Sequence, residues 1–194
     1  LFIKSPKRWI YFLNLIFGYL YFLVNPKFIG TNLKLLFLKI IVKNQNLKFV
    51  DLHAKKFVER RIKISSNRNI LEIIKEYKRL GYYMIIASGS LDVYVKYFAI
   101  QLKFDEILST TLEVKNNKFT GLLKDGNCIG EKKRQAIDIM LKNKKQSWGN
   151  VIFFSDHHSD LPVFIQSNKV FAVRPTKKLI KNLDKNKKNY KIID

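Results

Sequence analysis

The chain has 194 residues, enough for one sizeable hydrophobic core or for a core domain with a smaller appended one. Its content of 47% hydrophobic and 13% aromatic residues excludes an intrinsically disordered chain, and its single cysteine, Cys128, excludes an internal disulfide framework. The formal charge of +22 attracts anions of every kind, but no zinc-finger spacing, helix-turn-helix pattern or RNA-binding aromatic signature accompanies it. We therefore expect no specific nucleic-acid partner, and the cysteine content favours a cytoplasmic protein.

The N-terminal region is apolar and basic. An apolar run from Ile10 to Val24 is shorter than the roughly 20 residues that a membrane-spanning helix needs. Apolar residues at helical spacing between Leu33 and Ile41, with lysines among them, predict a second, amphipathic helix. The segment Ile10 to Val42 then forms a helical hairpin, either a small cap packed on its own apolar faces or a surface that also contacts a membrane. A third helix is expected over Asp51 to Ile64, which makes residues 1–66 a helical cap region.

Helices and strands alternate from Asn69 onwards. An apolar stripe from Ile70 to Tyr77 predicts a helix, and Gly81 lies where a helix commonly ends in a left-handed cap. The elements expected next are a strand from Tyr82 to Ala87, a Ser-Gly-Ser turn, a helix from Leu91 to Leu102, and a hairpin of Ile107 to Val114 and Phe119 to Leu123 around Asn116-Asn117.

The C-terminal part continues the alternation. We expect a helix from Glu131 to Lys142, a strand from Val151 to Ser155, a short helix from Leu161 to Ile165, a last strand from Val170 to Val173 and a closing lysine-rich helix. Repeated alternation predicts an α/β fold with a Rossmann-like parallel sheet over residues 67–194, joined by right-handed crossovers. Ligands of such sheets bind at the carboxyl ends of the strands.

Three polar clusters fall where such a sheet places a site. Ser88 and Gly89 follow a predicted strand, and a hydroxyl with free amides there suits a phosphate, although Ser-Gly is also an ordinary turn. Lys133 lies in the first turn of a predicted helix, where it could offset the charge of a transferring phosphoryl group or simply face solvent. Asp156 and Asp160 follow an apolar strand and suit a hard cation such as Mg²⁺, or a helix N-cap.

The order of these clusters resembles a known superfamily. Strand-Ser-Gly, then Gly-x-x-Lys on a helix, then strand-Ser-Asp-x-x-x-Asp-Leu-Pro is similar to motifs two, three and four of the haloacid dehalogenase superfamily. The resemblance runs from about Lys4 to Asp194. It is closest to subfamily IB, the branch with phosphoserine phosphatase-like and phosphatidylglycerophosphatase C-like hydrolases, because of the helical segment before the sheet, the Cys-x-Gly-x-x-Lys form around Cys128 and the ending Tyr190 to Asp194.

The resemblance implies a Mg²⁺-dependent phosphomonoester hydrolase acting through an aspartyl-phosphate intermediate. Ser88 would then hydrogen-bond the phosphoryl group, Gly89 would let the backbone approach it, and Lys133 would neutralise it, with Lys132 as the alternative in register. Asp156 would be a Mg²⁺ ligand, and Asp160 would hold the water shell of the metal or orient Lys133.

The family's first motif, Asp-x-Asp-Gly-Thr after the first strand, is absent from the sequence. That motif carries the nucleophile and the general acid of the family, and no aspartate precedes Asp51, which itself begins a helix. Together with Leu1, this indicates an N-terminally truncated chain or fragment whose own activity would be low. The non-enzymatic alternative is a remnant that binds phosphate without turning it over.

Two other readings remain open. Asp156-His157-His158 is also the short signature of phosphoesterases with a metal pair, but that family needs further clusters and only His53 remains to supply one. A basic membrane or nucleic-acid binding module would bind tightly at low salt and lose affinity steeply as salt rises. The sequence leaves the substrate open between a phosphorylated small molecule and a lipid phosphate, with Ile10 to Val42 favouring the lipid.

Overall fold

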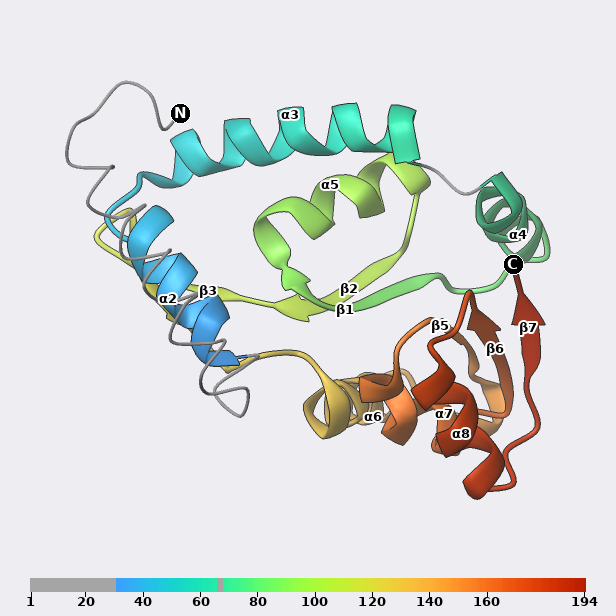
Figure 1. The fold of residues 1–194 in the computed structure, drawn as a ribbon. Coiled ribbons are helices and arrows are strands. Elements are labelled where there is room, and N and C mark those ends of the chain that lie inside the picture. The colour runs from blue at the N-terminus through green and yellow to red at the C-terminus, as the bar shows by residue number, and fades with distance from the viewer. Residues whose placement is uncertain (1–30, 66–67) are drawn as a thin grey trace. The chain divides into compact units, whose positions relative to one another are not determined.

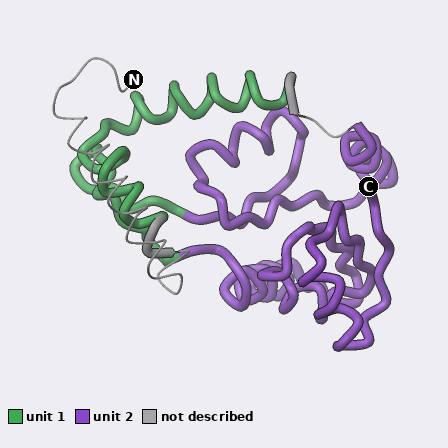
Figure 2. Tube along the Cα trace, viewed as in Figure 1, with its two compact units in different colours: residues 1–65, 111–126 green, residues 66–110, 127–194 purple. Residues whose placement is uncertain are grey.

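The structure, a computed structural model, describes residues 31–65 and 68–194. The chain forms two compact units, one of residues 1–65 and 111–126 and the other of residues 66–110 and 127–194 (Figure 2). Residues 111–126 group with the N-terminal region, which no local pattern in the sequence indicates. The predicted helix Ile10 to Val24 lies outside the described residues. Within 31–65 and 68–194, no helix combines the length and the apolar character needed to cross a bilayer.

The first unit contains two helices and a hairpin. Helices α2 (Thr31–Ile41) and α3 (Leu47–Ser65) match the second and third predicted helices, and strands β3 (Leu112–Lys115) and β4 (Lys118–Leu123) pair antiparallel. Their two-residue turn is Asn116-Asn117, with φ angles of 51° and 59°, which asparagine tolerates better than most residues. Helix α2 packs on β4 at Gly121, where an added Cβ would lie 3.1 Å from Lys39 Cα.

The second unit alternates helices and strands in the order that the sequence predicts (Figure 1). Its elements are α4 (Arg68–Arg79), β1 (Ile85–Leu91), α5 (Asp92–Leu102), β2 (Glu106–Thr110), α6 (Gly130–Asn143), β5 (Ile152–Ser155), α7 (Leu161–Gln166), β6 (Lys169–Val173), α8 (Lys177–Lys185) and β7 (Lys191–Ile193). Strands β1 and β2 pair parallel, and β5, β6 and β7 form a second parallel ladder. The α/β fold with parallel strands is therefore confirmed.

Three details differ from the sequence expectation. The first strand begins at Ile85 instead of Tyr82 and runs through the Ser-Gly-Ser segment, which was expected to be a turn. The strand expected from Ile107 to Val114 is divided into β2 and β3, because the chain passes from one unit to the other between Thr110 and Thr111. The chain also closes with the strand β7, not with the lysine-rich helix α8.

One hydrophobic core serves both parallel ladders. Buried side chains of α6, β5, α7, β6 and α8 form it, with Phe164, Val163, Leu179 and Leu183 fully buried. Ile85 and Ala87 of β1 and Leu108 of β2 pack against the same core, although no ladder hydrogen bond joins β1 to β5 among the described strands. Helix α6 contacts β1, β2 and α7, so it connects the two ladders.

Truncating the centre of this core should destabilise the second unit strongly. Phe164 has no exposed surface and its ring meets that of Phe153 edge to face at 5.1 Å. Phe164→Ala should lower the free energy of unfolding by about 3–5 kcal/mol, measured by urea denaturation, because it leaves a cavity. Ile139→Ala on α6 is the control, since that side chain is 60% exposed. Equal losses in the two variants would contradict this description of the core.

Candidate active site

The first part of the site is the carboxyl end of β1. The pairing of β1 with β2 shifts register between Ser88 and Leu91, and the backbone N–H of Ser90 donates to Ser88 Oγ at 3.1 Å. A Cβ added at Gly89 would lie 2.5 Å from Ile129 Cγ2, closer than real Cβ atoms approach. Only glycine permits this approach, so β1 and the loop before α6 meet directly at Gly89.

The second part is the start of α6, which lies between the other two loops. Ile129 has extended backbone and gives the helix no side-chain cap, so the first amides of α6 are left for other partners. Gly130 has a φ of 56°, and a Cβ added there would lie 3.5 Å from the carbonyl oxygen of Ser159. The start of α6 thus meets the carboxyl end of β1 at Ile129 and approaches the loop after β5 at Gly130.

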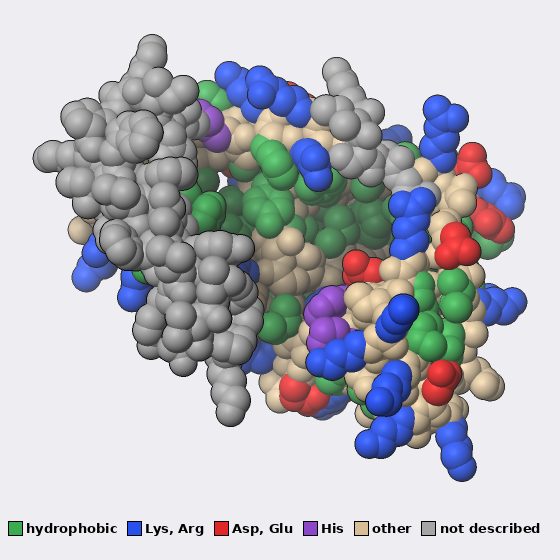
Figure 3. Space-filling model, in the orientation of Figure 1, with side chains coloured by type: hydrophobic (Ala, Val, Ile, Leu, Met, Phe, Trp, Pro, Cys, Tyr) green, Lys and Arg blue, Asp and Glu red, His purple; other side chains and the backbone are tan. Residues whose placement is uncertain are grey.

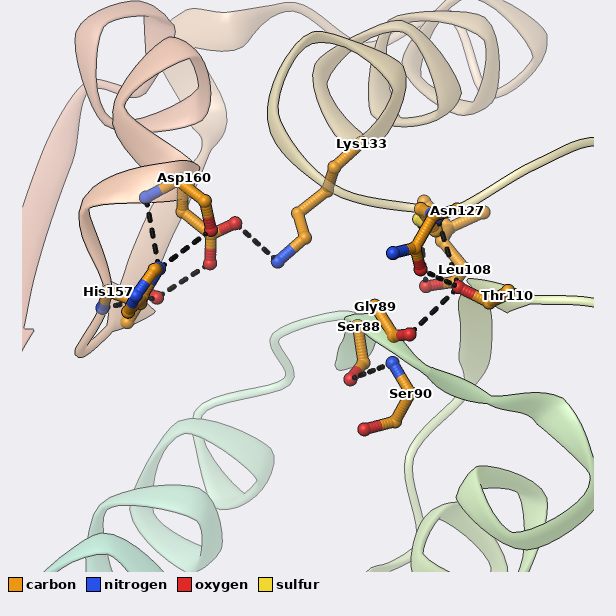
Figure 4. Close-up of polar contacts among 12 residues, drawn as sticks. Ser88, Gly89, Ser90, Leu108, Thr110, Asn127, Lys133, His157 and Asp160 are labelled. Atoms are coloured by element: carbon orange, nitrogen blue, oxygen red, sulfur yellow. Dashed lines mark hydrogen bonds and ion pairs between the residues drawn. The ribbon is translucent and has the colours of Figure 1, made fainter. Parts of the chain in front are cut away.

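The third part is a buried ion pair between α6 and the loop after β5. Lys133 Nζ lies 2.6 Å from Asp160 Oδ1, and the two side chains are only 6% and 8% exposed. Ser155 Oγ donates to the other carboxylate oxygen of Asp160 at 2.7 Å. Oδ1 has no hydrogen-bond partner among the described residues, so the charge of Lys133 is what compensates it. In Figure 4 the Lys133 side chain extends from α6 towards Asp160.

This geometry separates the two candidate lysines. Lys132 is exposed, whereas Lys133 is 5% exposed and paired with Asp160. Burial of a lysine without a partner carries a large desolvation cost, which Asp160 offsets here. The structure therefore favours Lys133 over Lys132 as the cation of the site.

The loop after β5 also carries two histidines. Asp156 and His157 are exposed, and the N–H of Ser159 donates to His157 Nδ1 at 3.2 Å. The rings of His157 and His158 lie 4.0 Å apart. Burial lowers the pKa of His158 below its ordinary value, and the nearby charges of His157 and Lys178 lower it further.

The structure allows a test of whether these residues suit a metal ion. Among residues 31–65 and 68–194, no three His, Cys, Asp or Glu side chains gather as a ligand set. Asp160 is occupied by Lys133 and Ser155, so its contacts favour orienting the lysine over binding metal. Asp156, exposed at the end of β5, fits a single carboxylate ligand of Mg²⁺, which binds through one or two carboxylates together with waters and substrate phosphate.

Sequence reasoning missed two residues that hold the site together. Thr110, the last residue of β2, is fully buried, and its hydroxyl contacts Gly89 and Asn127. Ser155 fixes Asp160. Thr110 belongs to no motif, and Ser155 is part of the strand-Ser-Asp pattern but was given no role, because only the placement of the neighbouring loops shows what either residue contacts.

Basic side chains do not gather at one place on the visible face of the described chain. Figure 3 shows Lys and Arg side chains spread over that surface, with few acidic groups between them. A surface of this kind attracts anions without forming a shaped binding patch.

Comparison with known proteins identifies the family. The family model for haloacid dehalogenase-like hydrolases matches residues 33–164, well over half of the sequence. The chain belongs to that family. No curated protein matches the sequence of this chain.

Solved structures share the fold of this family member at low sequence identity. A protein of unknown function from Bordetella pertussis Tohama I has a TM-score of 0.73 at 15% identity, over 93% of this chain and 79% of that one. A probable phosphoserine phosphatase from Vibrio cholerae has a TM-score of 0.66 at 16% identity, over 87% of this chain and 50% of that one. A phosphoserine phosphatase solved in its apo form has a TM-score of 0.62 at 21% identity, over 84% of this chain and 74% of that one. The predicted resemblance to the haloacid dehalogenase family is therefore confirmed by the family model, and the fold is shared with structures solved as phosphoserine phosphatases.

Breaking the buried ion pair should cost far more than breaking an exposed one on the same helix. Lys133→Met leaves Asp160 buried without its cation and should lower the free energy of unfolding by about 3–5 kcal/mol in urea denaturation. Lys142→Met is the matched control, because Lys142 pairs with Asp138 at 2.9 Å but is 74% exposed, and it should barely change the denaturation midpoint. Similar losses in both variants would show that the Lys133 pair is not buried in solution.

The lowered pKa of His158 predicts acid sensitivity. In an NMR titration the His158 imidazole should titrate below the ordinary histidine value of 6.5, because burial disfavours its cation. As the pH falls, the unfolded chain takes up this proton before the folded chain does. The free energy of unfolding should therefore decrease from about pH 6.5 down to the lower pKa of the folded state. His158→Gln should remove that part of the loss. A midpoint at or above 6.5 would contradict the assignment.

Proposed function

We propose that this chain forms the phosphate-binding part of a Mg²⁺-dependent phosphomonoester hydrolase that works through an aspartyl-phosphate intermediate. The observation that carries the proposal is the buried Lys133, held by Asp160 on a helix whose first turn follows Ile129, the residue that meets Gly89 of β1. A fixed cation next to a hydroxyl and backbone amides suits a phosphoryl group, whose charge spreads over its oxygens during transfer. Membership of the hydrolase family supports the reaction class.

Each residue has a separate role in this proposal. Ser88 donates its hydroxyl to a phosphoryl oxygen, and Gly89 keeps side-chain bulk away from the phosphate. Lys133 offsets the negative charge of the phosphoryl group, and Asp160 positions Lys133 through their 2.6 Å contact. Because Lys133 is already held in place, little reorganisation is needed when the anion arrives.

Asp156 is the residue that would hold Mg²⁺. The bound ion would supply charge neutralisation at the phosphoryl oxygens. Mg²⁺ retains water and substrate phosphate as ligands, so one protein carboxylate gives weak binding, and a second would strengthen it. The described residues offer Asp156 for this purpose and keep Asp160 for Lys133.

The nucleophile is the part of the reaction that these motifs do not provide. Neither Ser88 nor Lys133 can act as the attacking carboxylate, and Asp160 is bound to Lys133. The 194 residues contain no Asp-x-Asp-Gly-Thr stretch. We therefore infer that turnover requires a carboxylate brought to the carboxyl end of β1 and β5 from outside these motifs.

The substrate in this proposal is a phosphomonoester of a small molecule or of a lipid. Support for the small molecule comes from the fold shared with phosphoserine phosphatases. The lipid alternative, peripheral membrane contact and a cytoplasmic location remain predictions. The membrane prediction rests on Ile10 to Val42, of which the structure describes only the part from Thr31.

Hydrolysis of an aryl phosphate tests the proposal directly. The 194-residue chain and a version preceded by a strand ending in Asp-x-Asp-Gly-Thr are compared with Mg²⁺ and with EDTA. The longer version should hydrolyse the ester with Mg²⁺ only, and Asp156→Asn should remove that activity, whereas the 194-residue chain should show little turnover. Turnover by the shorter chain that Asp156→Asn abolishes would contradict the inference about the nucleophile. Inactivity of both folded chains would contradict the phosphatase proposal.

A further inference from the structure

Thr110 is the most completely buried polar residue near the site, and it joins three loops. It ends β2 and has no exposed surface. Its Oγ1 lies 2.9 Å from the carbonyl oxygen of Gly89, 2.8 Å from Asn127 Oδ1 and 3.0 Å from the backbone nitrogen of Cys128. Figure 4 shows these contacts converging on the hydroxyl.

The hydroxyl of Thr110 uses all of its hydrogen-bonding capacity. A threonine hydroxyl donates one hydrogen and accepts two. The Gly89 carbonyl can only accept, so it takes the Thr110 hydrogen, and the Cys128 N–H can only donate, so it fills one lone pair. The remaining lone pair suits the amide NH₂ of Asn127, whose oxygen and nitrogen are assigned from their surroundings. Each of the three partners therefore makes a hydrogen bond with this one hydroxyl.

The partners belong to the two parts of the site that contact phosphate in the proposed function. Gly89 lies between Ser88 and Ser90 in the β1 turn, and Cys128 leads through Ile129 and Gly130 into α6, which carries Lys133. Ile129 gives α6 no side-chain cap, and the hydrogen bonds of Thr110 join the segment that leads into that helix to Gly89 of β1. The chain also leaves the second unit directly after Thr110 and returns to it at Asn127.

We propose that Thr110 is a positioning residue, which sets the placement of the Ser88 turn relative to Lys133 without touching the phosphate. This inference rests on the proposed function, because it assumes that Ser88 and Lys133 bind one phosphate together. Removing the hydroxyl deletes the hydrogen bond to the Gly89 carbonyl and the one from the Cys128 N–H, so the two segments lose the group that joins them and can shift relative to each other. The predicted result is weaker phosphate binding in a chain that still folds.

The experiment is a titration of the 194-residue chain with inorganic phosphate, in which binding is measured from the amide NMR shifts. Thr110→Val keeps the shape but not the hydroxyl and should weaken phosphate binding about tenfold or more, while Thr110→Ser should stay within about twofold of the unaltered chain. Ser167→Ala is the matched control. Ser167 is also fully buried, and its Oγ donates to the carbonyl oxygen of Val163 at 2.8 Å. Neither residue belongs to the site, so the variant should lose stability and keep its phosphate affinity.

The outcomes separate this inference from the proposed function. If the unaltered chain does not bind phosphate, the proposed function fails. If it binds and Thr110→Val binds equally well, the positioning role is overturned. Should Thr110→Val not fold, Asn127→Ala takes its place, because it removes one contact of the hydroxyl and should weaken phosphate binding several-fold. Unchanged affinity in a folded Asn127→Ala chain would likewise overturn the role.

Discussion

The buried contact between Lys133 and Asp160 is the constraint on which the site depends. A lysine that is 5% exposed is stable as a cation only beside a fixed anion, so the loop after β5 has to bring Asp160 to α6. Ser155, at the end of β5, holds the second oxygen of that carboxylate. The ion pair thus connects the loop after β5 to the first turn of α6, the helix that packs on both parallel ladders.

Close backbone approaches complete this arrangement on both sides of α6. Gly89 lets β1 meet Ile129, and Gly130 lets the same loop meet Ser159. A side chain at Gly89 would collide with Ile129, whereas Gly130 requires glycine because of its φ of 56°. The packing of these loops therefore positions the site residues as much as the charged groups do. The hydrogen bonds of Thr110 contribute to the same packing.

Local pattern was sufficient for most of the fold. The apolar stripe of α4, the left-handed Gly81 and the Asn116-Asn117 turn act over a few residues, so the sequence predicts them well. The grouping of residues 111–126 with the N-terminal region depends on contacts between distant segments, such as Gly121 against α2, and no local signal reports them. The same limit applied to the site: spacing favoured Lys133 but kept Lys132 as the alternative in register, and burial distinguishes the two lysines.

The proposed function requires Ser88 and Lys133 to contact one bound phosphate at the carboxyl end of the strands, near Asp156. The most direct test is a crystal of the 194-residue chain soaked with tungstate, a heavy-atom analogue of phosphate, and read by anomalous diffraction. We predict one dominant peak within hydrogen-bonding distance of Ser88 Oγ and Lys133 Nζ. Strong peaks only over surface lysines, with none beside Lys133, would contradict the account.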